Sequence, residues 1–481
     1  RGSGETNTTH YGQDIQDNRI QTIWRELKNS SRFDARRLEL AQWNRAHSHA
    51  KRGIAITPVK FGISFTVTHL NQAGALVLIY QDGTVQINHG GTEMGQGLHT
   101  NVRAIASRAL GVPPERVRLM PTSTDKIPNT SATAASSGTD LNGAAVQNAC
   151  EILRERLRPI ASALLNQLSA IGHQPSAIGD LPSGQAAGPA TEPNIPPQDV
   201  SKPTPNQLSP VGNRLSAPDP QPQPAANAAH NLIFQNDTVF DPSRPEISIS
   251  FSDLVRRAYL ERISLSATGF YATPGIHWNR ETGRGNPFHY FAYGAAVTEV
   301  EIDAFTGMHS VTRVDILHDV GDSINPGVNR GQIEGGFVQG MGWLTTEELK
   351  WDPAGRLLTH SPDTYKLPAI GDAPQIFNVA FLSGAAQKDV VHGSKAVGEP
   401  PLMLAISVRE AIRDAVAAFG PAGCEIPLAS PATCEAIFAA IQNQRRDSSN
   451  PVEVDASPLH NSATCEAAGR QAGAPGPRQP A

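Results

Sequence analysis

The chain has 481 residues, 39% hydrophobic and 18% charged, which is typical of a globular protein with two or three domains or with one large domain that carries insertions. Its net charge of −5 argues against a dedicated nucleic-acid-binding protein, and no apolar run is long enough to cross a membrane. The four cysteines form no CxxC pair and no iron–sulfur or zinc spacing. We therefore expect reduced thiols and a cytoplasmic protein.

The first part of the chain combines helical and β-forming patterns. The pair Asp82-Gly83 lies between two apolar runs, 75–80 and 84–88, and predicts a hairpin. Apolar residues at helical spacing predict three helices, over residues 21–28, 33–47 and 97–110.

The composition changes abruptly near Asn166. Residues 166–235 are rich in Pro, Gln, Asn and Ala, and they carry too few large apolar groups to offset the entropy of ordering. We predict a disordered insertion there and a disordered tail over 445–481. The insertion divides one domain into two parts, 1–165 and 236–444. Because no Met or leader stands at Arg1, we also expect the chain to be a piece of a longer protein.

The second part of the chain again mixes strands and helices. Ser252 is expected to cap a helix that runs to Glu261, and two strands are expected over 290–302 and 309–319. A later helix runs from Pro400 to Gly420. The helix over 329–344 has a second row of residues, namely Gln332, Gly336, Gln339 and Trp343. Strands and helices are mixed without regular βαβ alternation, which favours an α+β fold.

Three segments rich in small residues could carry chemistry, and the first spans residues 89–97. Gly95 lets the backbone approach a ligand closely, and Gln96 offers both a hydrogen-bond donor and an acceptor. The N–H groups at the start of the following helix would suit an anionic phosphate or the polar edge of a heterocycle. The alternative is a tight strand–helix connection that binds nothing.

The second segment, residues 130–138, is a run of Ser, Thr and Ala that allows backbone close to a flat ligand, or is an ordinary loop. The third, residues 393–401, places Glu399 before two prolines that start a helix. A carboxylate at that helix end is favoured in its ionised form, as a general base requires. The alternative is a glutamate that only caps the helix.

Six collinear segments resemble the xanthine dehydrogenase/aldehyde oxidase family. Three of them read GGTEMGQGLH at 90–99, GQIEGGFVQG at 331–340 and SKAVGEPP at 394–401, and the others are residues 51–66, 122–131 and 285–291. The resemblance implies the molybdenum-cofactor-binding domain of that family, with mixed sheets and packed helices. It implies molybdenum held by the dithiolene of molybdopterin, without a direct protein ligand.

The resemblance also implies residue roles. Glu399 would deprotonate the Mo–OH group, whose oxygen attacks an electron-poor ring carbon while hydride passes to the sulfido ligand. The residues that match pterin-binding positions of the family are Gly95, Gln96, Ala135, Ser136, Gln339 and Gly398. Gly138 stands where the family often has a second hydroxyl group, so the resemblance does not imply that contact here.

The positions that border the substrate match Phe65, Thr66 and Leu70, with Ala134 in the small-residue run. An aromatic ring suits a planar heterocycle, although Phe65 could also be a core residue. These segments resemble the xanthine dehydrogenases of the family more than the aldehyde oxidases. They imply oxidation of hypoxanthine and xanthine to urate. The alternatives are oxidation of an aldehyde or another N-heterocycle, and an inactive remnant that binds no metal.

The resemblance finally implies partners. Residues that orient the purine would lie upstream of this chain, so we expect it to join the preceding half of the molybdenum subunit. A partner domain or subunit would carry two [2Fe–2S] centres and FAD and pass electrons to NAD. We thus expect a hetero-oligomer that acts on a purine and binds neither nucleic acid nor a membrane.

Overall fold

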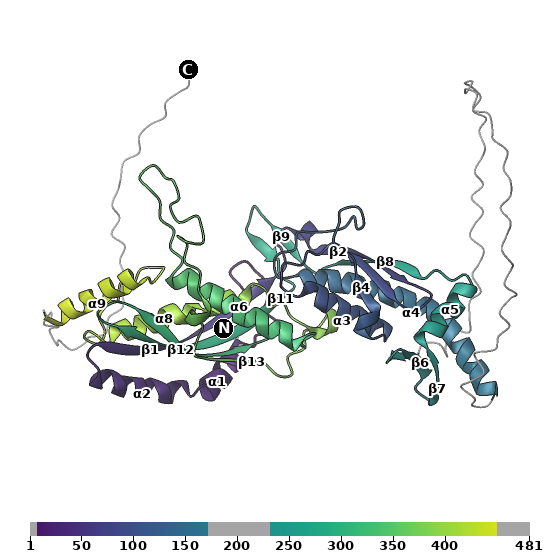
Figure 1. The fold of residues 1–481 in the computed structure, drawn as a ribbon, viewed down its shortest axis with the longest axis horizontal. Coiled ribbons are helices and arrows are strands. Elements are labelled where there is room, and N and C mark those ends of the chain that lie inside the picture. The colour runs from purple at the N-terminus through teal and green to yellow at the C-terminus, as the bar shows by residue number, and fades with distance from the viewer. Residues whose placement is uncertain (1–6, 172–230, 450–481) are drawn as a thin grey trace, which may run out of the picture.

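The computed structural model describes residues 7–171 and 231–449. Two parts lie side by side along its long axis (Figure 1). One is built on a sheet with strand order β1–β11–β12–β13, and the other on a sheet with order β4–β3–β2–β8. Each sheet contains one parallel pair among antiparallel pairs, and helices pack on both. The predicted α+β class with mixed sheets is therefore confirmed.

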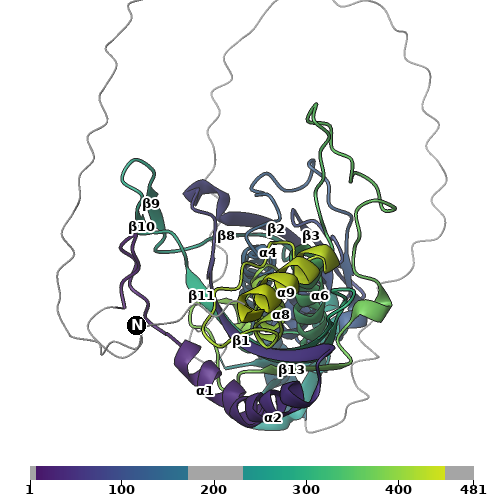
Figure 2. The same cartoon turned by 90° about the vertical axis from the view of Figure 1, so that its left-hand side faces the viewer.

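The first sheet is covered by helices on both faces, as the end view shows (Figure 2). Its strands are β1 (Ala50–Ile63), β11 (Tyr290–Asp303), β12 (His309–His318) and β13 (Ile376–Phe381). Helices α1 (Ile20–Ser30) and α2 (Phe33–Ala46) cover one face. The other face carries α6 (Pro326–Thr345), α7 (Pro400–Leu404), α8 (Ile406–Ala417) and α9 (Cys434–Ser449). Because helices cover both faces, β11 is apolar over most of its length, without the alternation of a half-exposed strand.

The second sheet carries the long helix α4 (Gly138–Ile171) and α3 (Leu98–Leu110). A Cβ atom on Gly269 would lie 1.9 Å from the carbonyl oxygen of Ala145, so glycine is required where α4 crosses the sheet. The strands are β2 (Gln72–Ile79), β3 (Val85–His89), β4 (Val117–Leu119) and β8 (Ser266–Ala272). The smaller elements are β5 (Ile233–Gln235), β6 (Thr238–Asp241), β7 (Arg244–Ser250), α5 (Phe251–Leu260), β9 (His277–Asn279) and β10 (Arg284–Asn286).

Most elements expected from local patterns are confirmed. The hairpin around Asp82-Gly83 is the β2–β3 pair, and the helices expected over 21–28, 33–47 and 97–110 are α1, α2 and α3. The expected cap at Ser252 is wrong, because the Ser250 hydroxyl accepts the hydrogen bond from the Asp253 N–H three residues on, which is the usual N-cap geometry.

The helix expected from Pro400 to Gly420 is two helices, α7 and α8. The chain tightens at Ala405, whose N–H bonds to the carbonyl of Leu402 and whose carbonyl accepts from Val408, both three residues away. The apolar face is still as expected, since Leu404, Val408, Ile412 and Ala415 are all buried.

The edges of the expected insertion also differ. Helix α4 continues to Ile171, and strand β5 starts at Ile233, so residues at both ends of the 166–235 range form regular structure. The tail predicted from residue 445 overlaps the end of α9. The rest of both segments lies outside the described residues, and the division of the domain into two parts stays a prediction. None of the helices in the described part of the chain is long and apolar enough to cross a bilayer.

Candidate cofactor and active site

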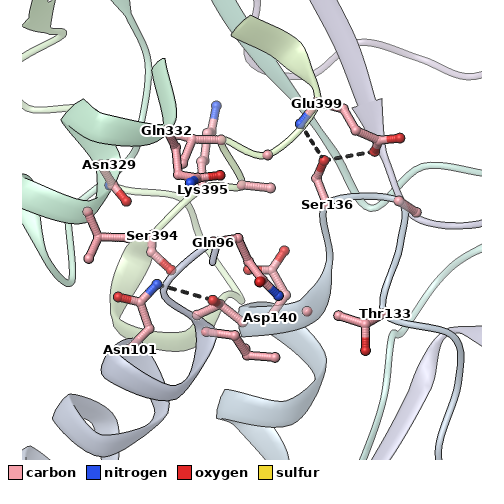
Figure 3. Close-up of a pocket in the computed structure, with 18 of the residues that line it drawn as sticks. Gln96, Asn101, Thr133, Ser136, Asp140, Asn329, Gln332, Ser394, Lys395 and Glu399 are labelled. Carbon is pink, nitrogen blue, oxygen red and sulfur yellow. Dashed lines mark hydrogen bonds between the residues drawn. The ribbon is translucent and has the colours of Figure 1, made fainter. Parts of the chain in front are cut away.

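A cavity of about 280 Å³ lies where the two parts meet. Four segments that are far apart in the sequence line it (Figure 3). They are the loop before α3 with its first turn, residues 133–140 at the start of α4, the start of α6, and residues 394–399. Three of these segments are the amino-terminal ends of helices, whose partial positive charge favours an anionic ligand.

The start of α3 is occupied by a side chain of the protein itself. The Glu93 carboxylate accepts hydrogen bonds from the N–H groups of Gly95 at 2.9 Å, Gly97 at 3.0 Å and His99 at 2.8 Å. These bonds hold the pKa of Glu93 below its usual value, although burial opposes them. Glu93 thus occupies three of the N–H groups that the sequence offered to a phosphate or the polar edge of a heterocycle, and ligand binding at this helix start stays a prediction.

Gln96 lines the cavity, whereas Gly95 lies beside it in the loop. The Gln96 amide closes this loop: its oxygen accepts from the Met94 N–H at 2.6 Å and its nitrogen donates to the Thr92 carbonyl at 2.8 Å. Gly95 has φ +96°, and a Cβ atom added there would meet nothing within 4 Å, so its role is the turn itself.

The loop over residues 133–138 brings Ser136 against Glu399. Both Ala135 and Ser136 have positive φ, of 53° and 55°, which costs energy in residues other than glycine and is common at functional sites. The Ser136 hydroxyl donates to Glu399 Oε2 and accepts from the Glu399 N–H, both at 2.8 Å (Figure 3). A Cβ atom on Gly398 would lie 3.1 Å from the Ser136 Oγ, so glycine keeps this approach open.

Glu399 does not cap a helix with its side chain. It stands at the N-cap of α7, but its carboxylate makes no capping hydrogen bond. The carboxylate is exposed at the cavity, and Ser136 holds only one of its two oxygens. The capping alternative therefore has no geometric support, whereas a group that accepts a proton at the cavity fits this arrangement.

Replacement of Ser136 by Ala is expected to lower kcat roughly tenfold to hundredfold with little change in KM, because hydrogen bonds to a charged group are worth about 1.5–3 kcal/mol. Steady-state kinetics of the assembled enzyme measures this. Ser137→Ala is the matched control, since within residues 7–171 and 231–449 the buried Ser137 hydroxyl bonds only to the Ala134 carbonyl of its own loop. Equal kinetics in the two variants would contradict the role of Ser136.

Asp140 forms a buried part of the cavity wall in the first turn of α4. Burial raises the pKa of Asp140 to about 7, against the lowering effect of the hydrogen bond from the Tyr290 hydroxyl. Because this folded-state pKa lies above the ordinary value, the native protein holds a proton that the unfolded chain releases.

The pH dependence of stability follows from this shift. The contribution of protonated Asp140 to the free energy of unfolding is fully present below about pH 4 and is lost as the pH rises through about 7. Between about pH 5 and about pH 8 we expect the free energy of unfolding of the wild type to fall by about 2–3 kcal/mol relative to that of Asp140→Asn, whose side chain cannot ionise. Denaturant unfolding of both proteins across this range measures the difference. A constant difference at all pH values would rule the shift out.

The segment before Glu399 is anchored by a buried ion pair. The Lys395 ammonium lies 2.6 Å from Asp319 Oδ2 and donates to the Phe291 carbonyl at 3.0 Å. Arg19 adds a second cation, 3.1 Å from the same carboxylate. Both Lys395 and Asp319 are almost completely buried, so each charge depends on the other. Burial lowers the pKa of Lys395, and Asp319 opposes this effect.

Helix α6 contributes Gln332 to the cavity, and not Gln339 as the sequence predicted. Gln339 is exposed and lies outside the cavity lining. The two glutamines are seven residues apart, which is close to two helical turns, so they share a face but differ by about 10 Å along the axis. The expected residue type and face thus agree with the structure, but the position along the helix does not.

The four residues expected at the substrate divide into two groups. Ala134 lines the cavity together with Ala135, Ser136, Gly398 and Glu399. Phe65, Thr66 and Leu70 do not, and they belong to a loop closed by Asn71. The Asn71 amide bonds to the N–H and the carbonyl of Phe65 at 2.7 and 2.9 Å. Phe65 is only half-buried and belongs to none of the apolar clusters of the described residues, which disfavours the core alternative.

Sequence reasoning missed several lining residues that carry polar groups. They lie in the first two turns of helices or shortly before Glu399, which is the signal that could have found them: Asn101, Asp140, Asn329, Gln332, Ser394 and Lys395.

The lining suits a flat group with a polar edge and a negative charge. Ala134, Ala135 and Gly398 leave room for a planar ring, while the amides of Asn101, Asn329 and Gln332 can bond to heteroatoms at its edge. The starts of α4 and α6 add a field that favours an anion. A pterin that carries a phosphate has this combination of properties, so the residues present fit the cofactor that the sequence predicted.

Relatives with known names match most of this chain. Xanthine dehydrogenase/oxidase of Felis catus is 41% identical over 446 residues, which is 92% of this chain and 27% of the relative. Xanthine dehydrogenase of Oryza sativa subsp. japonica is 40% identical over 449 residues, covering 91% and 27% of the two chains. The chain thus spans about a quarter of the length of these relatives.

Solved structures share the fold at lower identity. Quinoline 2-oxidoreductase from Pseudomonas putida aligns with a TM-score of 0.68 and 23% identity, over 91% of this chain and 47% of the other. The aldehyde oxidoreductase from Desulfovibrio desulfuricans aligns with a TM-score of 0.61 and 20% identity, over 90% and 36%.

The family is decided by a third comparison. The family model described as the molybdopterin cofactor-binding domain matches residues 26–171 and 223–374, which is more than half of the chain. These residues include the starts of α3, α4 and α6, whose first turns line the cavity. The chain therefore belongs to the molybdopterin cofactor-binding domain family.

Proposed function

We propose that this chain is the molybdopterin-binding part of a molybdenum hydroxylase that oxidises hypoxanthine and xanthine to urate. The observation that carries the proposal is the Ser136–Glu399 pair, which sets a carboxylate at the mouth of a cavity suited to a pterin. The names and the 40–41% identity of the xanthine dehydrogenase relatives support the choice of substrate.

Different residues of the chain bind the cofactor and accept the proton. When bound, the molybdenum–pterin group supplies the two-electron oxidation and the transfer of oxygen. Gln96, Gln332, Ala135 and the Gly398 backbone hold and orient the pterin. Glu399 accepts a proton as the general base: Ser136 holds its Oε2 atom, which leaves Oε1 to take up the proton.

Phe65, Thr66 and Leu70 would border the purine once the remainder of the protein closes the site. Their place outside the cavity is consistent with a substrate position between this chain and another segment. Electrons would leave through [2Fe–2S] centres and FAD on a partner domain or subunit, toward NAD.

An exposed apolar surface supports a missing partner. The segment between α6 and β13 carries Trp351, Leu367 and Ile370 with 56%, 63% and 98% of their surface exposed. A partner that covered these side chains would remove their apolar surface from water, which is favourable. Because the chain spans a quarter of its relatives, we assign this surface to the preceding half of the molybdenum subunit.

The second candidate is oxidation of an aldehyde or another N-heterocycle, which the folds of quinoline 2-oxidoreductase and aldehyde oxidoreductase keep open. Steady-state rates of the assembled enzyme on xanthine, quinoline and benzaldehyde separate the two. Xanthine turnover that allopurinol blocks supports the first candidate. Faster turnover of benzaldehyde or quinoline supports the second.

Molybdenum and pterin content tests whether the cavity binds the cofactor at all. A side chain at Gly398 would press on Ser136 and fill the cavity, so Gly398→Val is expected to lower the molybdenum content of the assembled enzyme several-fold. Gly331→Ala is the control, because nothing lies within 4 Å of a Cβ atom at that position. Molybdenum near zero in the wild type would instead identify an inactive remnant.

A further inference from the structure

A chain of buried hydrogen bonds links the wall of the cavity to the segment that carries Glu399. The Tyr290 hydroxyl donates to Asp140 Oδ2 at 2.7 Å, and the same hydroxyl oxygen accepts from the Ala396 N–H at 2.8 Å. Asp140, Tyr290 and Ala396 are each less than 9% exposed. Ala396 precedes Glu399 by three residues, so this series of hydrogen bonds ends close to the candidate base.

The direction of these bonds is determined by the chemistry of the groups. A tyrosine hydroxyl has a single proton, and an amide N–H can only donate. With its oxygen occupied as acceptor for Ala396, Tyr290 needs an acceptor for its own proton, and the structure supplies Asp140. Donation to a carboxyl group also makes the Tyr290 oxygen a better acceptor, because linked hydrogen bonds strengthen one another.

The second support of the segment uses a different set of hydrogen bonds, although Lys395 also lies over the ring of Tyr290. Lys395 bonds to Asp319 and to the Phe291 carbonyl, and its ammonium lies 5.8 Å from the centre of the Tyr290 ring. The two supports hold adjacent residues. Only the bond to Ala396 depends on Asp140. Mutation of Asp140 therefore separates the effect of this bond from that of the Lys395 ion pair.

We propose that Asp140 is a positioning residue, which acts through Tyr290 and the Ala396 N–H to hold the 394–399 segment and thereby place Glu399. This inference rests on the proposed function for the role of Glu399, but the structural link does not. Asp140 itself lies in the cavity wall, three residues into α4 and four residues after Ser136. The start of α4 therefore contacts the Glu399 segment at two points, Ser136 directly and Asp140 through Tyr290.

The first test is amide hydrogen exchange of the assembled protein without cofactor, followed by mass spectrometry of peptides that contain residues 394–399. Tyr290→Phe removes the acceptor of the Ala396 N–H, so exchange of this segment is expected to rise about tenfold. Tyr293→Phe is the matched control: it lies in the same strand, and its buried hydroxyl has no hydrogen-bond partner among the described residues. Equal exchange in the two variants overturns the proposal.

The second test compares two replacements of Asp140. Asp140→Asn retains an oxygen that accepts from Tyr290, whereas Asp140→Ala does not. We expect the Ala variant to raise exchange of the segment and to lower kcat about tenfold at unchanged KM, and the Asn variant to restore most of both. Failure of Asn to restore them, or a change confined to KM, contradicts the positioning role.

The two hypotheses fail in different ways. If the Asp140→Ala and Tyr290→Phe variants raise amide exchange of residues 394–399 but Glu399→Gln retains normal turnover, the proposed function is wrong while the structural link is supported. If Glu399→Gln abolishes turnover and exchange is unaffected by Tyr290→Phe, the inference alone is overturned.

Discussion

Glu399→Gln is expected to lower turnover of the assembled enzyme by roughly 10²- to 10⁴-fold, because it removes the general base while keeping the size of the side chain. The Gln side-chain oxygen can still accept from Ser136, so the loop and the cavity should keep their shape. Molybdenum content and KM should therefore remain close to the wild-type values. Pre-steady-state reduction by substrate, measured on fully loaded enzyme, isolates the affected step.

Glu410→Gln is the control for this substitution. Glu410 is a carboxylate of the same region, but it pairs with Arg409 and Arg413 on the surface of α8, away from the cavity lining. A near-normal rate is expected for it. If Glu399→Gln behaves like Glu410→Gln on fully loaded enzyme, Glu399 is not the base.

Asp319→Asn is expected to destabilise the protein by about 3–5 kcal/mol, the usual cost of removing one partner from a buried ion pair. The change leaves the Lys395 ammonium, whose side chain is 1% exposed, without a carboxylate in contact among the described residues and with the Phe291 carbonyl as its remaining backbone acceptor. Since Lys395 lines the cavity, cofactor content should fall as well. Denaturant unfolding and molybdenum analysis measure the two effects.

Two further variants distinguish an ion-pair effect from general damage. Lys395→Met should lower the free energy of unfolding less than Asp319→Asn does, because Asp319 keeps Arg19 as a cationic partner at 3.1 Å. The double variant with Asp319→Asn should recover part of the loss, as it leaves no unpaired ammonium. Glu334→Gln, which breaks a half-exposed pair with Arg330 on α6, should change stability little. A double variant no more stable than Asp319→Asn alone would exclude this explanation.

Local patterns were sufficient for most secondary structure. The β2–β3 hairpin follows from Asp82-Gly83, because this pair favours the tight turn that joins two antiparallel strands. The buried faces of α3 and α8 follow from apolar spacing over three or four turns. Even so, the Ser250 cap and the break at Ala405 escaped prediction, since each depends on individual hydrogen bonds that periodicity does not report.

The candidate site was predictable where its residues lie in runs that resemble the family. Ala134, Ala135, Ser136, Gly398 and Glu399 lie in runs whose resemblance to the family is unambiguous, and all five line the cavity. Gln339 was chosen in place of Gln332, because the two share a helix face and only the neighbours across the cavity tell them apart. The Glu93 carboxylate at the start of α3 could not be foreseen, because its bonds depend on how the loop folds back on itself.

The sequence by itself determined the fold class, most of the segments that meet at the cavity and the carboxylate proposed as the base. Only the tertiary structure decided which polar groups share the cavity and how the Glu399 segment is held. The Asp140–Tyr290 and Tyr290–Ala396 bonds join residues 150 and 106 positions apart. Periodicity and turn chemistry act over a few residues, whereas contacts at such separations depend on how the sheets and helices pack.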